Sequence, residues 1–148
     1  MNLYEIKDYC RSNFNVYLKK AIEQIPPIQD VNFLDIGCGT GVSILEIAKI
    51  TNYNLTAIDT DEDSLKILEN KIQRSNYSER ISVMRGAIET VNLPEKNYDI
   101  ILAEGLFNII GFENGLLISS GFLADNGYMI IHDELKDRAF KLQIFKKN

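Results

Sequence analysis

Residues 33–41 read Phe-Leu-Asp-Ile-Gly-Cys-Gly-Thr-Gly, and this stretch is the most informative part of the chain. An apolar run ends in Asp35, three glycines follow at alternate positions, and an apolar pattern of helical spacing begins at Val42. Glycines so spaced let the backbone turn tightly and admit a ligand against the main chain, because no Cβ is in the way. A strand, a glycine loop and a helix N-terminus in this order predict a nucleotide-type site in an open α/β sheet. Taken alone, the glycine pattern also fits a structural turn without a ligand.

The acid at the end of the next apolar run supports the ligand interpretation. Residues 55–58 form a short, mainly apolar run that ends in Asp59. An acid about 20 residues beyond the glycine loop, at the tip of the second strand, is placed to accept hydrogen bonds from ribose hydroxyls. Asp59 could instead cap the helix that follows, since Asp is a favoured N-cap residue. We expect Thr60 or Asp61 to be the cap, which leaves Asp59 to face the ligand.

Several segments together resemble the class I S-adenosylmethionine-dependent methyltransferases. The resemblance covers about residues 30–135 and departs from the family in one turn, where Asp125-Asn126-Gly127 replaces the usual Pro-Gly-Gly. The segments that carry it are the glycine motif 35–41, Asp59 at the position of the ribose-binding acid, 85–89 beside the adenine, 97–104 as the fourth strand with its active-site end, and 123–131 as the turn and fifth strand.

The resemblance implies that the chain binds S-adenosylmethionine through its glycine loop. On the family pattern, Asp35 orients the cofactor's amino group, the Gly37 carbonyl accepts a hydrogen bond from that group, and Asp59 holds the ribose. Glu89 is either an acceptor for the exocyclic amine of the adenine or simply the cap of a surface turn. The implied cofactor-binding residues are Asp35, Gly37, Cys38, Gly39, Gly41, Asp59, Thr60, Ala87 and Ile88, the last two flanking the adenine, and Glu104.

Two side chains at the ends of strands are candidate catalytic residues. Glu104 follows the apolar strand Tyr98–Ala103, and ligands bind at the carboxyl end of such sheets. Its carboxylate could stabilise the sulfonium charge, accept a substrate proton or bind a substrate amine; a hydrogen bond to the following loop is the structural alternative. His132, the only histidine, ends the fifth strand. It acts there either as a base, since its unperturbed pKa lies near neutrality, or as a structural residue.

Alternating strand and helix patterns predict an α/β fold, a three-layer Rossmann-like sandwich with a mainly parallel sheet. The 148 residues suit one methyltransferase-like domain. Residues 1–27 are expected to form a helical cap, in one helix or in two pieces broken near Asn13 or Asn15, ended by Pro26-Pro27. We expect five strands in the order 3-2-1-4-5, without the usual sixth and seventh strands of the family.

The structure of the C-terminal residues determines what pairs with the fifth strand. Residues 134–147 are interpreted as one helix with an apolar face, although short alternating runs also fit a strand. A helix here would leave strand five at the edge of the sheet with unpaired backbone groups. That predicts either a truncated protein or a homodimer formed through the strand-five edge. The helical face would consist of Leu135, Ala139, Leu142 and Phe145, and the strand alternative rests on Phe140, Leu142 and Ile144.

Composition excludes several classes of protein. The formal net charge is −5, which argues against a nucleic-acid partner, since phosphate backbones attract basic faces. Apolar runs are far shorter than the ~20 residues that span a bilayer, so no membrane partner is expected. Cys10 and Cys38 have no paired spacing, so neither a disulfide nor a metal site is indicated and a cytoplasmic setting is expected. The segment 103–106, Ala-Glu-Gly-Leu, also lacks the Asn/Asp-Pro-Pro motif of amino-directed nucleic-acid methyltransferases.

The resulting hypothesis is methyl transfer from S-adenosylmethionine to a small-molecule acceptor, with the N-terminal helix as a lid. The alternative is a truncated or degenerate methyltransferase-like module that binds S-adenosylmethionine or a partner chain without catalysis. A nicotinamide-dependent oxidoreductase is disfavoured, because Val42 stands where G-x-G-x-x-G has its third glycine.

Overall fold

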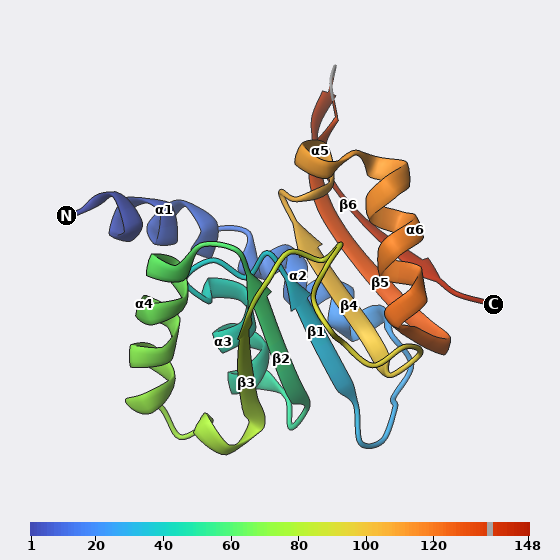
Figure 1. Cartoon of the computed structure of the whole chain (residues 1–148), viewed down its shortest axis with the longest axis horizontal. Coiled ribbons are helices and arrows are strands. Elements are labelled where there is room, and N and C mark those ends of the chain that lie inside the picture. The colour runs from blue at the N-terminus through green and yellow to red at the C-terminus, as the bar shows by residue number, and fades with distance from the viewer. Residues whose placement is uncertain (136–137) are drawn as a thin grey trace.

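A single sheet of six strands organises the chain (Figure 1). The computed structural model describes the backbone of residues 1–135 and 138–148, and the side chains of residues 1–134 and 144–148. In chain order, the elements are α1 Leu3–Ser12, α2 Asn15–Gln24, β1 Asn32–Ile36, α3 Val42–Ile50, β2 Asn54–Asp59, α4 Glu62–Gln73, the 3₁₀ turn η1 Ser78–Arg80, β3 Ile81–Arg85, β4 Tyr98–Glu104, α5 Phe107–Ile110, α6 Phe112–Phe122, β5 Leu123–Leu135 and β6 Arg138–Lys146.

The sheet runs β3-β2-β1-β4-β5-β6, and its first five strands are parallel. The predicted α/β Rossmann-like class and the order 3-2-1-4-5 are thus confirmed. Central strand β1 is buried on both faces: Phe33 and Leu34 point to opposite sides and neither is exposed. Strands covered on both sides read as nearly continuous apolar runs, which is why β1 was recognisable in the sequence.

Helices cover the two faces of the sheet in separate layers (Figure 1). One core contains the buried residues of α2, α3 and α4, including Leu18, Ile44 and Leu68, together with Phe33 of β1. The other contains Phe107 of α5 and partly buried side chains of α6, packed on the opposite strand faces. The sheet and the helical layer on each of its faces leave the carboxyl ends of β1, β2 and β4 uncovered, where a site can form.

The N-terminal segment forms two helices, α1 and α2, separated at residues 13–14, which is the two-piece alternative and not the single helix. Helix α2 buries Leu18 and Ala21, whereas α1 buries none of its residues. Polar contacts hold α1 instead: the Asp8 carboxylate lies 2.7 Å from Nζ of Lys71 and accepts a hydrogen bond from the Thr40 hydroxyl. Among the described residues, no helix has both the length and the apolar character needed to cross a bilayer.

The C-terminal segment corrects three expectations. The helix over residues 134–147 is wrong, because residues 138–146 form β6, which pairs antiparallel with β5. The sheet therefore has six strands and not five, and the strand-five edge proposed as a homodimer interface is already paired. A short alternating run fits either structure, and the open donors and acceptors of β5 favour the extended one. The helical face assigned to Leu135, Ala139 and Leu142 lies outside the described side chains.

Two glycines of α6 give a matched test of packing in the second core. A Cβ on Gly115 would lie 2.5 Å from Cδ1 of the fully buried Phe107, whereas a Cβ on Gly121 would meet nothing within 4 Å. We expect Gly115→Ala to lower the free energy of unfolding by about 1–3 kcal/mol through overpacking. Gly121→Ala should raise it by up to about 1 kcal/mol, since Ala favours helix. Urea unfolding measures both, and equal stability of the two variants would contradict this packing.

Candidate functional site

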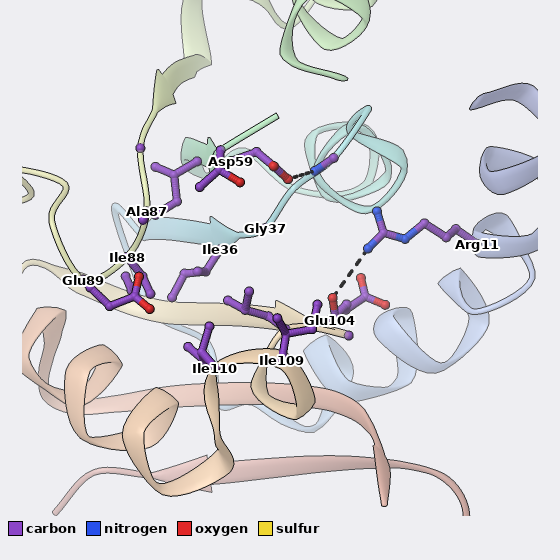
Figure 2. Close-up of a pocket in the computed structure, with 16 residues that line it drawn as sticks. Arg11, Ile36, Gly37, Asp59, Ala87, Ile88, Glu89, Glu104, Ile109 and Ile110 are labelled. Atoms are coloured by element: carbon purple, nitrogen blue, oxygen red, sulfur yellow. Dashed lines mark hydrogen bonds between the residues drawn. The ribbon is translucent and has the colours of Figure 1, made fainter. Parts of the chain in front are cut away.

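A cavity of about 430 Å³ lies at the carboxyl ends of β1, β2 and β4 (Figure 2). Arg11 and Glu104 lie toward one end of it in the view, and Ala87, Ile88 and Glu89 toward the other. The lining residues are Arg11 of α1, Ile36, Gly37 and Gly39 of β1 and its loop, Ile58, Asp59 and Thr60 at the end of β2, Gly86–Glu89 after β3, and Glu104–Leu106, Ile109 and Ile110 of β4 and α5.

The glycine loop is held to the tip of β2 by three backbone donors. The N–H groups of Gly37 and Cys38 donate to the carbonyl of Ile58 at 2.8 and 3.0 Å, and Gly39 N–H donates to Oδ2 of Asp59 at 2.7 Å. Gly39 has φ +54°, and a Cβ there would stand 2.7 Å from Nη1 of Arg11. The loop therefore needs glycine both for its conformation and for the approach of Arg11.

Asp59 is not the cap of the following helix. Asp61 is the N-cap of α4, where its carboxylate accepts from Asp63 N–H at 3.1 Å and from the Ser64 hydroxyl at 2.7 Å. The expectation that Thr60 or Asp61 caps this helix is thus confirmed. Oδ1 of Asp59 accepts from Asp61 N–H at 2.9 Å, so each Asp59 oxygen has one backbone donor. A carboxylate offers about four acceptor positions, and Asp59 keeps capacity toward the cavity that it lines.

Asp35 lies buried in β1, two residues before Gly37, and does not line the cavity. Its side chain is 2 % exposed, and its Oδ2 has no hydrogen-bond partner among the described residues. Burial raises the pKa of Asp35 to about 8, helped by the negative charges of Glu104 and Asp59 and opposed by Arg11. At neutral pH this carboxyl is therefore held largely in its protonated form.

Glu104 forms a polar cluster with residues from two other elements. Its carboxylate accepts a hydrogen bond from the Ser43 hydroxyl of α3, and Oε2 lies 3.3 Å from Nδ1 of His132. Burial works to raise the pKa of Glu104, but the hydrogen bonds from His132 and Ser43 outweigh it and hold the pKa below its usual value. His132 is buried and does not line the cavity, so its contact with the site runs through Glu104.

The structure brings together most of the residues expected to bind the cofactor. Three of them are near the cavity without lining it: Asp35, Cys38, which is buried, and Gly41, which is the N-cap of α3. Those that line the cavity are Gly37, Gly39, Asp59, Thr60, Ala87, Ile88 and Glu104. Glu89, left open between adenine acceptor and surface cap, lines it as well.

Arg11 is a site residue that the sequence did not indicate. Its guanidinium reaches from α1 over Gly39, and Nη2 lies 3.5 Å from the backbone carbonyl oxygen of Glu104, as Figure 2 shows. Arginine in an amphipathic helix is usually a surface residue, and no motif links position 11 to the glycine loop. Only the close packing of α1 on that loop reveals it.

Comparison with known proteins places the chain in a family. Residues 33–116 match the family described as "Methyltransferase domain". The ribosomal protein L11 methyltransferase of Ruminiclostridium cellulolyticum is 33 % identical over 107 residues, which are 72 % of this chain and 31 % of that protein. The chain belongs to the class I S-adenosylmethionine-dependent methyltransferase family.

Solved structures share the fold of this chain. A Methanococcus maripaludis protein assigned as an S-adenosyl-L-methionine-dependent methyltransferase superimposes with a TM-score of 0.78 at 19 % identity, over 89 % of this chain and 61 % of that one. Coclaurine N-methyltransferase, solved with N-methylheliamine and SAH, gives 0.66 at 26 % identity, over 85 % and 35 %. The chain thus spans less than two thirds of these relatives, whose acceptors are as different as a ribosomal protein and a small amine.

The raised pKa of Asp35 makes stability depend on pH. The folded protein holds this proton up to about pH 8, whereas an unfolded chain releases it near 3.8. Its contribution to stability is therefore complete below about pH 4 and is lost as the pH rises toward 8. We expect urea unfolding to show a free energy that falls from pH 5 to pH 8, and Asp35→Asn to reduce the fall. Equal pH slopes in the two proteins would contradict the buried, protonated state of Asp35.

Proposed function

We propose that this chain binds S-adenosylmethionine and transfers its methyl group to a small-molecule acceptor. One observation carries the proposal: the glycine loop and the Asp59 carboxylate, joined by the Gly39 hydrogen bond, border the same cavity as Glu104. Family membership supplies the cofactor, because this family uses S-adenosylmethionine.

The residues of the cavity fit the parts of that cofactor. Asp59 has acceptor capacity for the ribose hydroxyls, and Ala87 and Ile88 offer apolar contact to the adenine. The missing Cβ of Gly39 leaves room for the guanidinium of Arg11 beside the loop. The guanidinium of Arg11 suits the carboxylate of the cofactor's amino-acid tail.

In methyl transfer, the main task of the protein is to position the cofactor and the acceptor. Bound S-adenosylmethionine supplies an electrophilic methyl group on a sulfonium, and in-line displacement depends on the alignment of the two reactants. Leu106, Ile109 and Ile110 give the cavity an apolar wall beside Glu104, which limits water there. Helix α1 extends over the loop and is held by the Asp8–Lys71 ion pair, an arrangement that suits a lid over the cofactor.

The net charge of the chain bears on the class of acceptor. The chain carries a net charge of −5, which does not favour a nucleic-acid acceptor. The alternative is a module that binds the cofactor or a partner chain without catalysis.

Calorimetric titration tests the cofactor assignment. We expect S-adenosylmethionine and its demethylated product to bind, and NAD not to bind. Asp59→Asn should weaken both by about 10- to 100-fold, because a hydrogen bond to a charged group contributes about 1.5–3 kcal/mol. Asp125→Asn, which changes an exposed carboxylate outside the cavity, is the matched control and should leave both affinities unchanged. Tight NAD binding with none of S-adenosylmethionine would refute the proposal.

Turnover separates the enzyme from a non-catalytic binder. Release of demethylated product with any member of a panel of small acceptors supports the methyltransferase. Binding of S-adenosylmethionine without turnover on such a panel supports the binding module.

A further inference from the structure

We infer that the acceptor is an amine with an apolar body, held in its ammonium form by the carboxylate of Glu104. The inference rests on the proposed methyltransferase function and adds to it the chemical class of the acceptor.

The charges around the cavity are unevenly distributed. Asp59, Glu89 and Glu104 line it, and Arg11 is the one cationic side chain among its described lining residues. Arg11 lies over Gly39, with Nη2 3.5 Å from the carbonyl oxygen of Glu104, and the proposed function pairs its guanidinium with the cofactor's own carboxylate. No cation among the described lining residues is then left to neutralise a carboxylate or phosphate on the acceptor. An anionic acceptor is disfavoured, because a buried charge without a partner is costly.

Glu104 has the capacity to bind an ammonium group. One hydrogen bond comes from Ser43 and one contact from His132, out of about four acceptor positions on a carboxylate. The side chain is only 15 % exposed, so little solvent competes for the remaining positions. A charge-assisted hydrogen bond in such a place is roughly twice as strong as a neutral one. An ammonium donor therefore gains more there than a hydroxyl of the same size.

The wall beside Glu104 is apolar and reaches the surface. Leu106, Ile109 and Ile110 line the cavity next to the end of β4, and Figure 2 shows Ile109 and Ile110 along the side that continues from Glu104. Ile109 is 77 % exposed, so this wall extends to the mouth. A molecule bound with its amine at Glu104 can rest its hydrocarbon part against these side chains. The arrangement thus selects for a charged nitrogen on an apolar body.

N-methylation of a bound ammonium releases one proton. The ammonium gives this proton to solvent, which frees the nitrogen lone pair. The nitrogen lone pair then forms the N–C bond to the methyl group as the C–S bond breaks, and the electron pair of that bond stays on sulfur. One proton is released per methyl transferred, and no further reactant is needed.

Three probes with the same phenylethyl group test the inference: 2-phenylethylamine, 2-phenylethanol and 3-phenylpropanoate, each titrated into protein saturated with demethylated cofactor. We expect the amine to bind at least about tenfold more tightly than the alcohol, and the carboxylate not to bind, because only the amine pairs with Glu104. Glu104→Gln should reduce the affinity of the amine to that of the alcohol, which itself stays unchanged. Glu104→Asp, which keeps the charge, should retain part of the preference.

Control measurements separate a direct role of Glu104 in acceptor binding from other causes of reduced affinity. Glu79→Gln changes an exposed carboxylate of η1, before β3 and outside the cavity, and should leave all three affinities unchanged. Retained binding of the demethylated cofactor by Glu104→Gln shows that the site is folded. Equal affinities for amine and alcohol would overturn the inference and leave the methyltransferase function standing. So would a Glu104→Gln variant that loses S-adenosylmethionine but not the demethylated product, since Glu104 would then serve the sulfonium. Failure of the wild-type protein to bind either cofactor form would refute the proposed function itself.

Discussion

The hydrogen bond from Gly39 N–H to Asp59 Oδ2, 2.7 Å long, is the contact on which the site depends. It joins the loop after β1 to the tip of β2, and it exists because these strands are parallel neighbours in register, with Ile36 opposite Ile58. Any change that shifts β1 against β2 would separate the loop from the acid. The pairing of β1 with β2 therefore sets the distance between the glycine loop and the Asp59 carboxylate, the two parts of the cofactor site.

Much of the fold was readable because the buried strands of a parallel sheet are apolar almost throughout. The two N-terminal helices match one of the two arrangements expected for residues 1–27, the one with a break near Asn13 or Asn15. The cap of α4, expected at Thr60 or Asp61 and found at Asp61, followed from a local preference that requires no knowledge of the tertiary structure. The converging residues of the site, Gly37, Gly39, Asp59 and Glu104, were predictable for a related reason: each stands at the carboxyl end of a recognisable strand.

The remaining features depend on contacts between segments distant in the sequence. β6 has the apolar spacing of a short run that fits helix or strand, and only the open edge of β5 makes it a strand. Arg11 enters the site from an exposed helix, and Ser43 and His132 meet at Glu104 from α3 and β5. No spacing rule connects these positions, because packing and not chain order brings them together. The raised pKa of Asp35 is caused mainly by burial, and it could not be predicted from the glycine motif in which Asp35 stands.

A crystal structure of the chain with the demethylated cofactor tests the central claim most directly. The account predicts the ribose hydroxyls within hydrogen-bond distance of the Asp59 carboxylate, the amino-acid tail against Gly37 and Gly39, and its carboxylate facing Arg11. A ligand bound elsewhere, or an Asp59 carboxylate that contacts only the amides of Gly39 and Asp61 while the ligand occupies the cavity, would contradict it.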